Sequence, residues 1–595
     1  MEATNATNGA DDVTSIETKP PLAPLTPTPT PPTPTPPPPP PASTAVADPP
    51  LAANKGFRFW AIMVAICFTG LLGAMEATIT STALPSVIAS LGGGDLYIWA
   101  VNGFLLSSTA FQPLFGQLAN VFGRRWPVIV AVATFILGSG ISGGATSIVM
   151  LIAGRVVQGI GGGGINVLIE IIVCDIVPLR ERGTYLGVIF GFIGLGTSLG
   201  PLFGGLIVEH TTWRWVFYIS LPVGGLALFL LTAFLKVNYE KETTLATKVS
   251  MIDWTGNAIF VAALTSVLIA LSWAGAVYPW SSFHVLVPLI IGLAGLVGFM
   301  FYEGSRFCPQ PMMPLKLFSN RTSSSSFAVT FLQSLTTIWL LYFLPVYFQG
   351  VQGVDPQESG VRLLPTILVV IPFGIAGGVL MTKTGRYRPF QQVGFALFTV
   401  AMGLLSILDE DSNAGEWVGF QVLAGGIGLL IPGLLPAVLA PLAESDTALA
   451  TATFSFLRSF GMVWGVAIAA AVFNTRFDQL AYRITDPAVR ADTMAGQAYQ
   501  RSTSAFLATL EPGTRAQFMS VVRDSLSLSF QVSVAFSALG FFLVFIQKEI
   551  PLRDKLDTKY GIADKDTKSD SEAGLRSNEK APGTGTTSGP DGDSS

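Results

Sequence analysis

The ionisable side chains inside or at the ends of long apolar stretches of this 595-residue chain include Glu76, Arg155, Glu170 and Asp175. A charged side chain at the centre of a membrane helix costs at least ~2.5 kcal/mol, so each of the four is a candidate functional residue. A buried carboxylate can take up and release a proton, whereas arginine stays protonated. These residue types predict reversible proton binding, with Glu76 as the first candidate beside the fixed positive charge of Arg155.

Glu170 and Asp175 cannot neutralise Arg155 along the same helix, because they lie ~22 and ~30 Å further on at about 1.5 Å per residue. Arg155 must therefore contact a carboxylate from another helix, a carbonyl group or water. For Glu76, in the last third of its apolar stretch, the alternative is a carboxylate that solvent wets at a helix end. For Asp175, a structural ion pair with the basic turn 180–182 is favoured over a role as proton carrier.

The composition places this chemistry in a membrane. Half of the residues are hydrophobic and only 12% are charged, which is typical of a polytopic membrane protein. The net charge of −4 indicates no nucleic-acid partner. No phosphate-binding loop, zinc motif or catalytic-triad spacing is present, so neither ATP-driven transport nor an enzyme is expected, and no cofactor. Cys67, Cys174 and Cys308 show no metal-binding spacing and are interpreted as packing residues.

Fourteen apolar stretches, each suited to a membrane helix, follow one another from residue 59 onward. They cover residues 59–83, 98–119, 127–146, 149–173, 184–208, 215–235, 254–274, 284–302, 325–348, 363–382, 390–408, 417–441, 449–473 and 527–547. Most basic residues of the short loops follow even-numbered stretches, so both tails are predicted to be cytoplasmic. Two loops depart from this pattern: 442–449 has no basic residue, and 474–526, predicted outside, has six arginines.

Composition and repetition divide the chain into five parts. Residues 1–54 are rich in proline and threonine and are predicted to be a disordered cytoplasmic tail, as are the polar residues 548–595. Between the tails, residues 55–240 are predicted to form a six-helix bundle and residues 241–310 two linking transmembrane helices. Residues 311–547 are predicted to form a second six-helix bundle, with a long extracellular loop at 474–526.

An internal repeat supports this division. Segment 116–127 recurs as 378–389, with two glycines, an arginine and the final proline in register. Eight stretches separate the copies, whereas two six-helix halves would need six, so the seventh and eighth stretches are inserted between the halves. Parallel repeats of this type meet at a substrate site near the bilayer midplane.

Glycines recur four apart in segment 187–205, at positions 187 and 191 and again at 196, 200 and 204. This spacing lets a second helix approach closely, and the proline at position 201 favours a bend. A single GxxxG motif is usually a plain packing face. The ordered set resembles the antiporter motif of the fifth helix in exporters of the major facilitator superfamily: Gly196, Gly200, Pro201, Gly204 and Gly205.

Other motifs of that superfamily stand at matching distances. Its loop motif is matched by Gly116, Asn120, Gly123, Arg124 and Arg125. Segment 155–161 resembles its fourth-helix arginine motif, and segments 78–85 and 213–222 are similar to motifs of the fourteen-span drug:proton antiporter family. The resemblance covers nearly all of residues 59–547, and fungal multidrug and toxin efflux pumps look most similar.

The resemblance implies an all-α polytopic membrane protein with the major facilitator fold, in which two six-helix repeats and two inserted linking helices make fourteen transmembrane helices. It implies a proton-coupled antiporter that exports drugs, toxins or secondary metabolites by alternating access. Arg155 then takes part in proton coupling, with Glu76, Glu170 and Asp175 as candidate carboxylates. Arg458, the buried cation of the second half, is expected to pair with an acid across the interface that the sequence does not identify.

Two positions depart from the family pattern. Asn120 stands where the loop motif usually has an acidic residue, so any charge relay there would have to work through hydrogen bonds. Glu76 stands where the first-helix motif usually has aspartate, which keeps the carboxylate but lengthens its reach.

A drug-like ligand needs an apolar cavity with a few polar groups. The candidate cavity residues are Asn102, Gln112, Gln158, Gln333, Trp339, Tyr342 and Gln349. The expected partners are a small-molecule substrate and the lipid bilayer, with the chain acting as a monomer in the plasma membrane or, alternatively, in the vacuolar membrane. Neither Asn5 nor Asn320 is expected to be glycosylated, because both are predicted to face the cytoplasm.

Three other functions stay open. Vacuolar carriers of basic amino acids and siderophore carriers resemble the same fourteen-span group, although a site for a basic amino acid would need several cavity acids. A transport-inactive nutrient sensor would need a long structured or charged cytoplasmic extension, whereas residues 548–595 are short and polar.

Overall fold

The computed structural model describes residues 56–91, 98–235, 244–275, 277–494 and 496–554, and this part is helical apart from one isolated bridge between Ala274 and Tyr278. The all-helical prediction is confirmed. The tail 1–54, Asn5 and residues 555–595 lie outside the described residues. The side chains at 81, 82, 85, 89, 98, 198 and 201 lie outside them too, so Pro201 is described only as helix backbone.

The first bundle consists, in chain order, of α1 (Phe57–Leu91), α2 (Ile98–Phe122), α3 (Arg125–Gly143), α4 (Ile148–Ile176), α5 (Leu179–His210), α6 (Trp215–Tyr218) and α7 (Ser220–Phe234). α1 packs along α5, and α4 packs against both α2 and α3. Isoleucine, valine, leucine and phenylalanine side chains fill the space between these helices, as their apolar sequences predict.

The second bundle consists, in chain order, of η2 (Leu315–Phe318), α11 (Arg321–Gly350), α12 (Pro356–Thr384), α13 (Arg388–Leu405), α14 (Ala414–Ala424), η3 (Gly425–Leu429), α15 (Ile431–Leu439), η4 (Glu444–Asp446), α16 (Thr447–Leu480), η5 (Ala481–Arg483), α17 (Pro487–Thr493), α18 (Ala498–Arg501), α19 (Ser504–Ala508) and α20 (Pro512–Ile546). α11 packs against both α16 and α20. The winding tightens to a 3₁₀ helix at η3, where three glycines precede Pro432, which has no N–H to donate.

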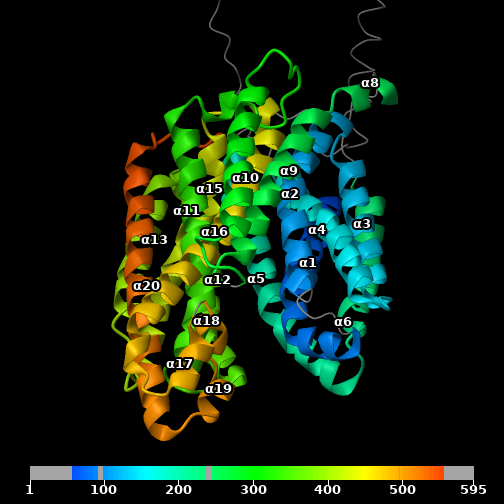
Figure 1. Cartoon of the computed structure of the whole chain (residues 1–595). Coiled ribbons are helices and arrows are strands. Elements are labelled where there is room, and N and C mark those ends of the chain that lie inside the picture. The colour runs from blue at the N-terminus through cyan, green and yellow to red at the C-terminus, as the bar shows by residue number, and fades with distance from the viewer. Residues whose placement is uncertain (1–55, 92–97, 236–243, 276, 495, 555–595) are drawn as a thin grey trace, which may run out of the picture. The chain divides into compact units, whose positions relative to one another are not determined.

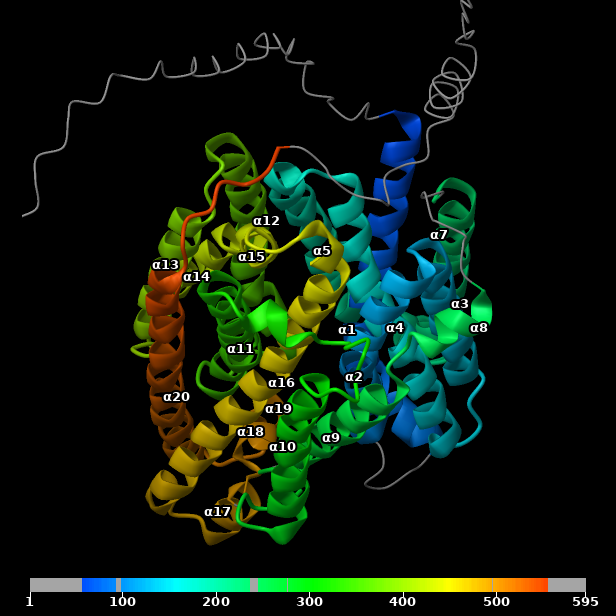
Figure 2. The same ribbon diagram turned by 90° about the horizontal axis from the view of Figure 1, so that it is seen from above.

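Two linking helices, α9 (Trp254–Trp273) and α10 (Phe283–Glu303), follow the short helix α8 (Leu245–Ser250) and pack against each other. α9 also contacts α2 of the first bundle and α16 of the second. Figures 1 and 2 show both linking helices beside these two bundle helices.

Twelve helices in the described part of the chain are long and apolar enough to cross a membrane. The predicted stretches 98–119 and 390–408 are also helical, as α2 and α13, but are not among the twelve. Polar side chains lower the hydropathy of both: α2 contains Ser107, Ser108 and Gln112, and α13 starts at Arg388. The chain therefore has a multi-pass helical membrane fold with twelve candidate spans, and the count of fourteen stays a prediction.

Successive spans run in alternating directions, so starts and ends of helices meet at each end of the bundles. At one end Arg58, at the start of α1, donates to the carbonyl of Phe234, at the end of α7 (3.1 Å). At the same end Arg180, at the start of α5, donates to the carbonyl of Thr382 near the end of α12 (2.7 Å). We call this the Arg180 end; α17, α18 and α19 lie at the opposite end (Figure 1).

The two copies of the sequence repeat have the same local structure. Gly123 (φ 77°) and Gly385 (φ 67°) follow α2 and α12 in the left-handed conformation, which costs glycine little. The first glycine of each copy packs against the other bundle. A Cβ on Gly116 would lie 2.2 Å from a side chain of α16, and a Cβ on Gly378 would lie 2.7 Å from a backbone oxygen of α5.

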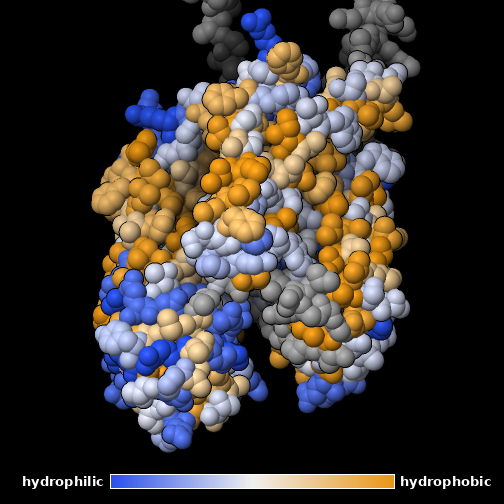
Figure 3. Space-filling view, viewed as in Figure 1, coloured by the Kyte–Doolittle hydropathy of each residue, from blue (hydrophilic) through white to orange (hydrophobic). Residues whose placement is uncertain are grey.

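The predicted loop 474–526 is partly helical. α16 continues to residue 480 and α20 starts at residue 512, so only segment 481–511 lies between them, and it is folded into η5, α17, α18 and α19. Surface ion pairs connect the part of α20 before residue 527 with other segments, among them Arg483–Asp524 (2.6 Å) and Arg523–Glu410 (2.9 Å). Polar side chains gather over this end in Figure 3, whereas apolar side chains cover much of the bundle flanks.

Candidate functional site

A buried ion pair joins α1 to α4 inside the first bundle. Arg155 Nη1 lies 2.9 Å from Glu76 Oε1, and both side chains are 0% exposed. Ser220 Oγ, on α7, donates to Glu76 Oε2 (2.7 Å), and Arg155 Nε donates to the carbonyl of Ala100 on α2 (2.9 Å). Four helices of the first bundle therefore each contribute a group to one polar site.

Gln158, one turn further along α4, extends this network. Its Oε1 accepts from Arg155 Nη1 (2.7 Å), and its Nε2 donates to Ser139 Oγ on α3 (2.7 Å). The ring of Phe104 lies 4.5 Å from the guanidinium carbon of Arg155, a cation–π contact. The connected polar residues, which we call the Glu76 site, are Glu76, Ser139, Arg155, Gln158 and Ser220.

Glu76 is not wetted at a helix end, because α1 continues to Leu91 and leaves Glu76 near its middle. Glycines on α4 let neighbouring helices close around Arg155. A Cβ on Gly159 would lie 2.0 Å from the hydroxyl of Ser107 on α2, and a Cβ at position 161 would lie 2.4 Å from a backbone nitrogen of α3. With solvent excluded, each charge of the pair is stabilised mainly by the other.

A second ion pair crosses from one bundle to the other. Arg458 Nη1, on α16, lies 2.5 Å from Glu170 Oε1 on α4, and Ser455 Oγ donates to the other oxygen of Glu170. Glu170 is 2% exposed, and the ring of Phe190 lies 5.0 Å from the Arg458 guanidinium. Glu170 is therefore the acid across the interface that the sequence did not identify.

Asp175 pairs with the loop motif. Arg124 Nε lies 2.6 Å from Asp175 Oδ2, and Arg124 Nη2 lies 3.3 Å from Oδ1, in a buried bidentate contact. The predicted partner was the turn 180–182, where Arg182 instead donates to the carbonyls of Cys174 and Val177. The difference arises because the end of α4 lies against the turn between α2 and α3.

The two other polar residues of the loop motif lie apart from this pair. Asn120 is half-buried and lines an open pocket at the Arg180 end, together with Lys316 and Asp446, which form an ion pair (2.6 Å). Arg125 Nη2 donates to the carbonyl of Thr232 near the end of α7 (2.9 Å). The charges at the Asn120 pocket therefore come from other segments than the loop motif.

The glycines of α5 serve two different neighbours. A Cβ on Gly196 would lie 2.5 Å from the carbonyl oxygen of Leu71, and one on Gly200 would lie 2.0 Å from Thr78 Oγ1, both on α1. Gly187 instead faces a backbone oxygen of α12 (3.1 Å). The glycine at 204 is buried, whereas a Cβ on the exposed glycine at 205 would meet nothing within 4 Å.

The structure does not gather the seven candidate cavity residues in one place. Trp339 is fully buried and donates to Ser529 Oγ on α20 (2.9 Å), so it packs inside the second bundle. The side chains of the others are engaged as follows: Gln158 in the Glu76 site, Gln112 with Ser459 of α16 (2.9 Å), Gln333 with Thr337 (3.0 Å) and Gln349 with Ser359 (3.5 Å). Tyr342 is 44% exposed and Asn102 half-buried.

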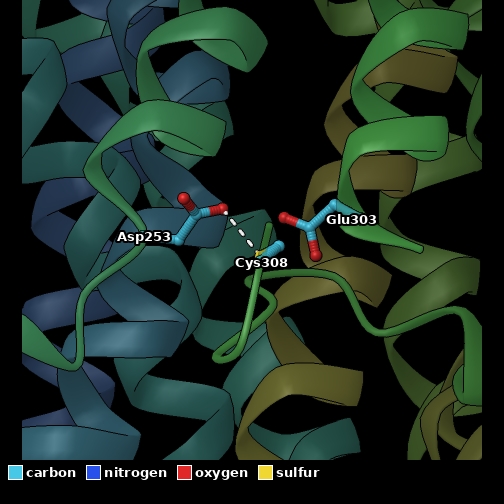
Figure 4. Close-up of side chains that lie close together, drawn as sticks. All are labelled: Asp253, Glu303 and Cys308. Atoms are coloured by element: carbon cyan, nitrogen blue, oxygen red, sulfur yellow. Dashed lines mark hydrogen bonds between the residues drawn. The ribbon is translucent and has the colours of Figure 1, made fainter. Parts of the chain in front are cut away.

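One cluster that the cysteine spacing did not predict lies where the linking helices meet the Arg180 end (Figure 4). The ligand atoms of Asp253, Glu303 and Cys308 lie within 4.8 Å of one another, close enough to hold a metal ion. All four carboxylate oxygens accept hydrogen bonds from the chain, two of them from the backbone N–H groups of Met312 and Met313. Burial raises the pKa of the Cys308 thiol to about 12, so the thiol stays protonated as the donor to Asp253. We interpret the cluster as a set of hydrogen bonds that holds segment 304–313 against the adjacent ends of α9 and α10.

Sequence reasoning also missed Ser220, Ser139, Ser455 and Glu444. Ser220 lies in segment 213–222, which carried a motif, so a signal for it existed. Glu444 lies in loop 442–449, the predicted inside loop without basic residues. It receives two cations from elsewhere, Arg182 Nη2 at 3.3 Å and Arg553 Nη2 at 3.4 Å.

Comparison with known proteins gives consistent matches. Residues 66–466 match the family model of the Major Facilitator Superfamily. The chain is 58% identical to the MFS-type transporter pydD of Acremonium sp, over 88% of this chain and 91% of that protein. It is 46% identical to the MFS-type efflux pump LUC4 of Fusarium sp, over 87% and 92%. The solved structure of the human organic anion transporter MFSD10 aligns with a TM-score of 0.52 at 14% identity, over 82% of this chain and 99% of that one, a likeness of fold alone.

Proposed function

Because the chain belongs to the major facilitator superfamily, and is thus a multi-pass membrane transporter of small molecules and not an enzyme, we propose that it exports organic compounds in exchange for protons. Relatives named as efflux pumps support this direction of transport. The observation that carries the proposal is the Glu76 site, in which a carboxylate and a guanidinium are both fully buried. Buried charges are costly in a membrane protein, so they are expected where charge is part of the function.

In this proposal Glu76 carries the proton. Arginine keeps its charge, so the net charge of the Glu76 site changes only when Glu76 is protonated. Protonation dissolves the ion pair and leaves Arg155 with Gln158 and the carbonyl of Ala100 as acceptors. The packing of α1 against α4 and α7 then differs between the two protonation states, which couples the proton to the movement of the helices.

Alternating access requires contacts between the bundles that break when one end opens. The Glu170–Arg458 pair and the hydrogen bond from Arg180 to Thr382 are of this kind, since each joins a first-bundle helix to a second-bundle helix. Glu170 is accordingly proposed to report the state of the bundles to the Glu76 site, and Asp175 to hold the end of α4 to the loop motif during this movement. The glycine set of α5 and the loop motif are proposed to guide this movement.

We propose fourteen spans, with both tails and the Arg180 end in the cytoplasm. The alternating helix directions support this count, because α2 and α13 run between neighbours that meet the criteria for a span. The proposed substrates are drugs, toxins or secondary metabolites, and the proposed site of action is the plasma membrane, with the chain acting as a monomer.

The orientation predicts that Asn320 carries no glycan. Asn320 caps α11 at the Arg180 end, where its Oδ1 accepts from Ser323 N (2.8 Å). Protein from a eukaryotic host should run at the same position on a gel before and after glycosidase treatment. A glycosidase-sensitive shift that disappears in Asn320→Gln would place this end outside the cell and overturn the topology.

The proposed function is tested in inside-out plasma-membrane vesicles with a panel of small organic compounds. At least one compound should accumulate when the lumen is made acidic, and the accumulation should collapse with a protonophore and need no ATP. Accumulation of basic amino acids alone, in vacuolar vesicles, would instead support the vacuolar carrier. If no compound accumulates, although the protein is present and folded, export is ruled out for that panel and the sensor becomes the leading alternative.

A further inference from the structure

The chain does not stop at the end of α20 but crosses the Arg180 end as segment 547–554, which we call the strap. Its first part is bound to the second bundle. Lys548 N donates to Thr322 Oγ1 on α11 (3.0 Å), and Tyr387 Oη, just before α13, donates to the carbonyl of Lys548 (2.5 Å). Gln547 and Leu552 are 2% and 5% exposed, so the strap is packed and does not merely lie on the surface.

The last part of the strap contacts both bundles. The backbone N–H of Arg180, at the start of α5, donates to the carbonyl of Arg553 (3.2 Å), and Arg180 Nη1 lies 3.0 Å from Asp554 Oδ1. Arg553 Nη2 donates to the carbonyl of Leu442 (3.1 Å) and lies 3.4 Å from Glu444 Oε1. One short segment therefore connects α5 with the chain around residue 443, between α15 and α16.

The strap meets the bundles where they are in closest contact. Arg180 also donates to the carbonyls of Thr382 (2.7 Å) and Lys383 (3.2 Å) at the end of α12, and Thr184 Oγ1 lies 2.9 Å from Thr382 Oγ1. Glu444 is shared between Arg182 of α5 and Arg553 of the strap. The contacts that α5 makes with α12, with Glu444 and with the strap must all separate if the Arg180 end is to open.

We propose that the strap is a latch that holds the Arg180 end closed. Glu444 pairs with both Arg553 of the strap and Arg182 of α5 and so links the strap to α5. This inference rests on the proposed alternating access. It adds a segment that regulates opening of the Arg180 end and lies outside all of the family motifs. Removing the latch shifts the population toward the state in which the Arg180 end is open. The substrate and the Glu76 site play no part in the latch itself.

The latch is tested by measuring how fast two introduced thiols cross-link. Thr184→Cys and Thr382→Cys place these thiols where the native hydroxyls are in contact. The native cysteines do not interfere, because Cys67, Cys174 and Cys308 are all buried. A stop codon after Lys548 removes the contacts to Arg180 and Glu444 but keeps those that Lys548 makes with Thr322 and Tyr387. The matched control is a stop codon after Asp554, which leaves the strap complete.

The rate of oxidative cross-linking between the introduced thiols should fall about threefold to tenfold after truncation at Lys548, because partly exposed ion pairs and a few hydrogen bonds give a modest bias. Truncation at Asp554 should leave the rate unchanged, and Asp554→Arg, which sets a like charge against Arg180, should lower it part of the way. Thermal unfolding identifies variants that are simply unstable. Equal rates in the two truncated proteins would overturn the latch, whatever the vesicle assay shows, because cross-linking needs no substrate.

Discussion

Replacement of Glu76 by Gln is expected to leave a protein that inserts in the membrane and binds substrate but cannot concentrate it. Gln keeps the size and an oxygen that can accept from Arg155, but it cannot be protonated. In proteoliposomes with a pH gradient of one unit, exchange of one proton per substrate supports up to ~10-fold accumulation, since about 1.4 kcal/mol corresponds to a factor of ten. The wild type should approach this ratio, whereas Glu76→Gln should stay near one.

The controls separate loss of coupling from loss of folding. Removing one partner of a buried ion pair can cost ~3–5 kcal/mol, so the thermal stability of Glu76→Gln must be measured beside transport. Glu76→Asp keeps a titratable group and should retain part of the accumulation. Arg155→Lys keeps the charge but loses the planar group that reaches Glu76, Gln158 and the carbonyl of Ala100 together, and should impair coupling. Equal, gradient-dependent accumulation by wild type and Glu76→Gln would exclude Glu76 and direct the search to Glu170 and Asp175.

Gly200→Ala is expected to reduce export at least ~10-fold, and Gly200→Leu to abolish it, with membrane insertion intact. The added methyl group of Ala would lie 2.0 Å from Thr78 Oγ1, 2.8 Å from the carbonyl oxygen of Met75 and 3.0 Å from Ile79 N. The hydroxyl can rotate away, but the backbone of α1 must move, and such overpacking costs ~1–3 kcal/mol. α1 carries Glu76, so the displacement reaches the Glu76 site. Export is measured as efflux of a transported compound from loaded cells at matched protein levels.

The same helix supplies a matched control for this prediction. A Cβ on Gly194, which is not one of the motif glycines, would meet nothing within 4 Å, so Gly194→Ala should export normally. Combining Gly200→Ala with Thr78→Ala removes the closest contact but not those to the α1 backbone, and should restore export only in part. Normal efflux by Gly200→Ala would contradict the close approach of α1 and α5 that the structure describes.

The ion pairs of the three candidate carboxylates Glu76, Glu170 and Asp175 differ in what surrounds them. Glu76–Arg155 lies within one bundle and is fully shielded, so it can survive a rotation of the bundles. Glu170–Arg458 connects the bundles, so the same rotation must break it. Asp175–Arg124 ties the end of α4 to the loop motif and is bidentate. This difference is why Glu76 is the preferred proton carrier and Glu170 the preferred sensor of the bundle positions.

The sequence by itself determined the helical membrane fold, the approximate positions of the long helices and the repeat. Apolar length decides whether a segment can cross a membrane, and glycines followed by a basic turn and a proline decide how a helix ends and the next begins. These are properties of neighbouring residues. The predicted stretches are therefore helical and the two copies of the repeat end alike, although several helices, among them α1 and α20, run beyond the predicted bounds.

Only the tertiary structure decided which charges meet. Glu170 finds Arg458 and Asp175 finds Arg124 because of how α4 is rotated against α16 and α2, which no local pattern encodes. For the same reason Glu444 is paired although its loop, 442–449, has no basic residue, since its cations come from α5 and the strap. Rotation also sends Trp339 toward α20. A polar or aromatic residue in an apolar helix shows that a partner must exist, but the partner depends on packing between helices far apart in the sequence.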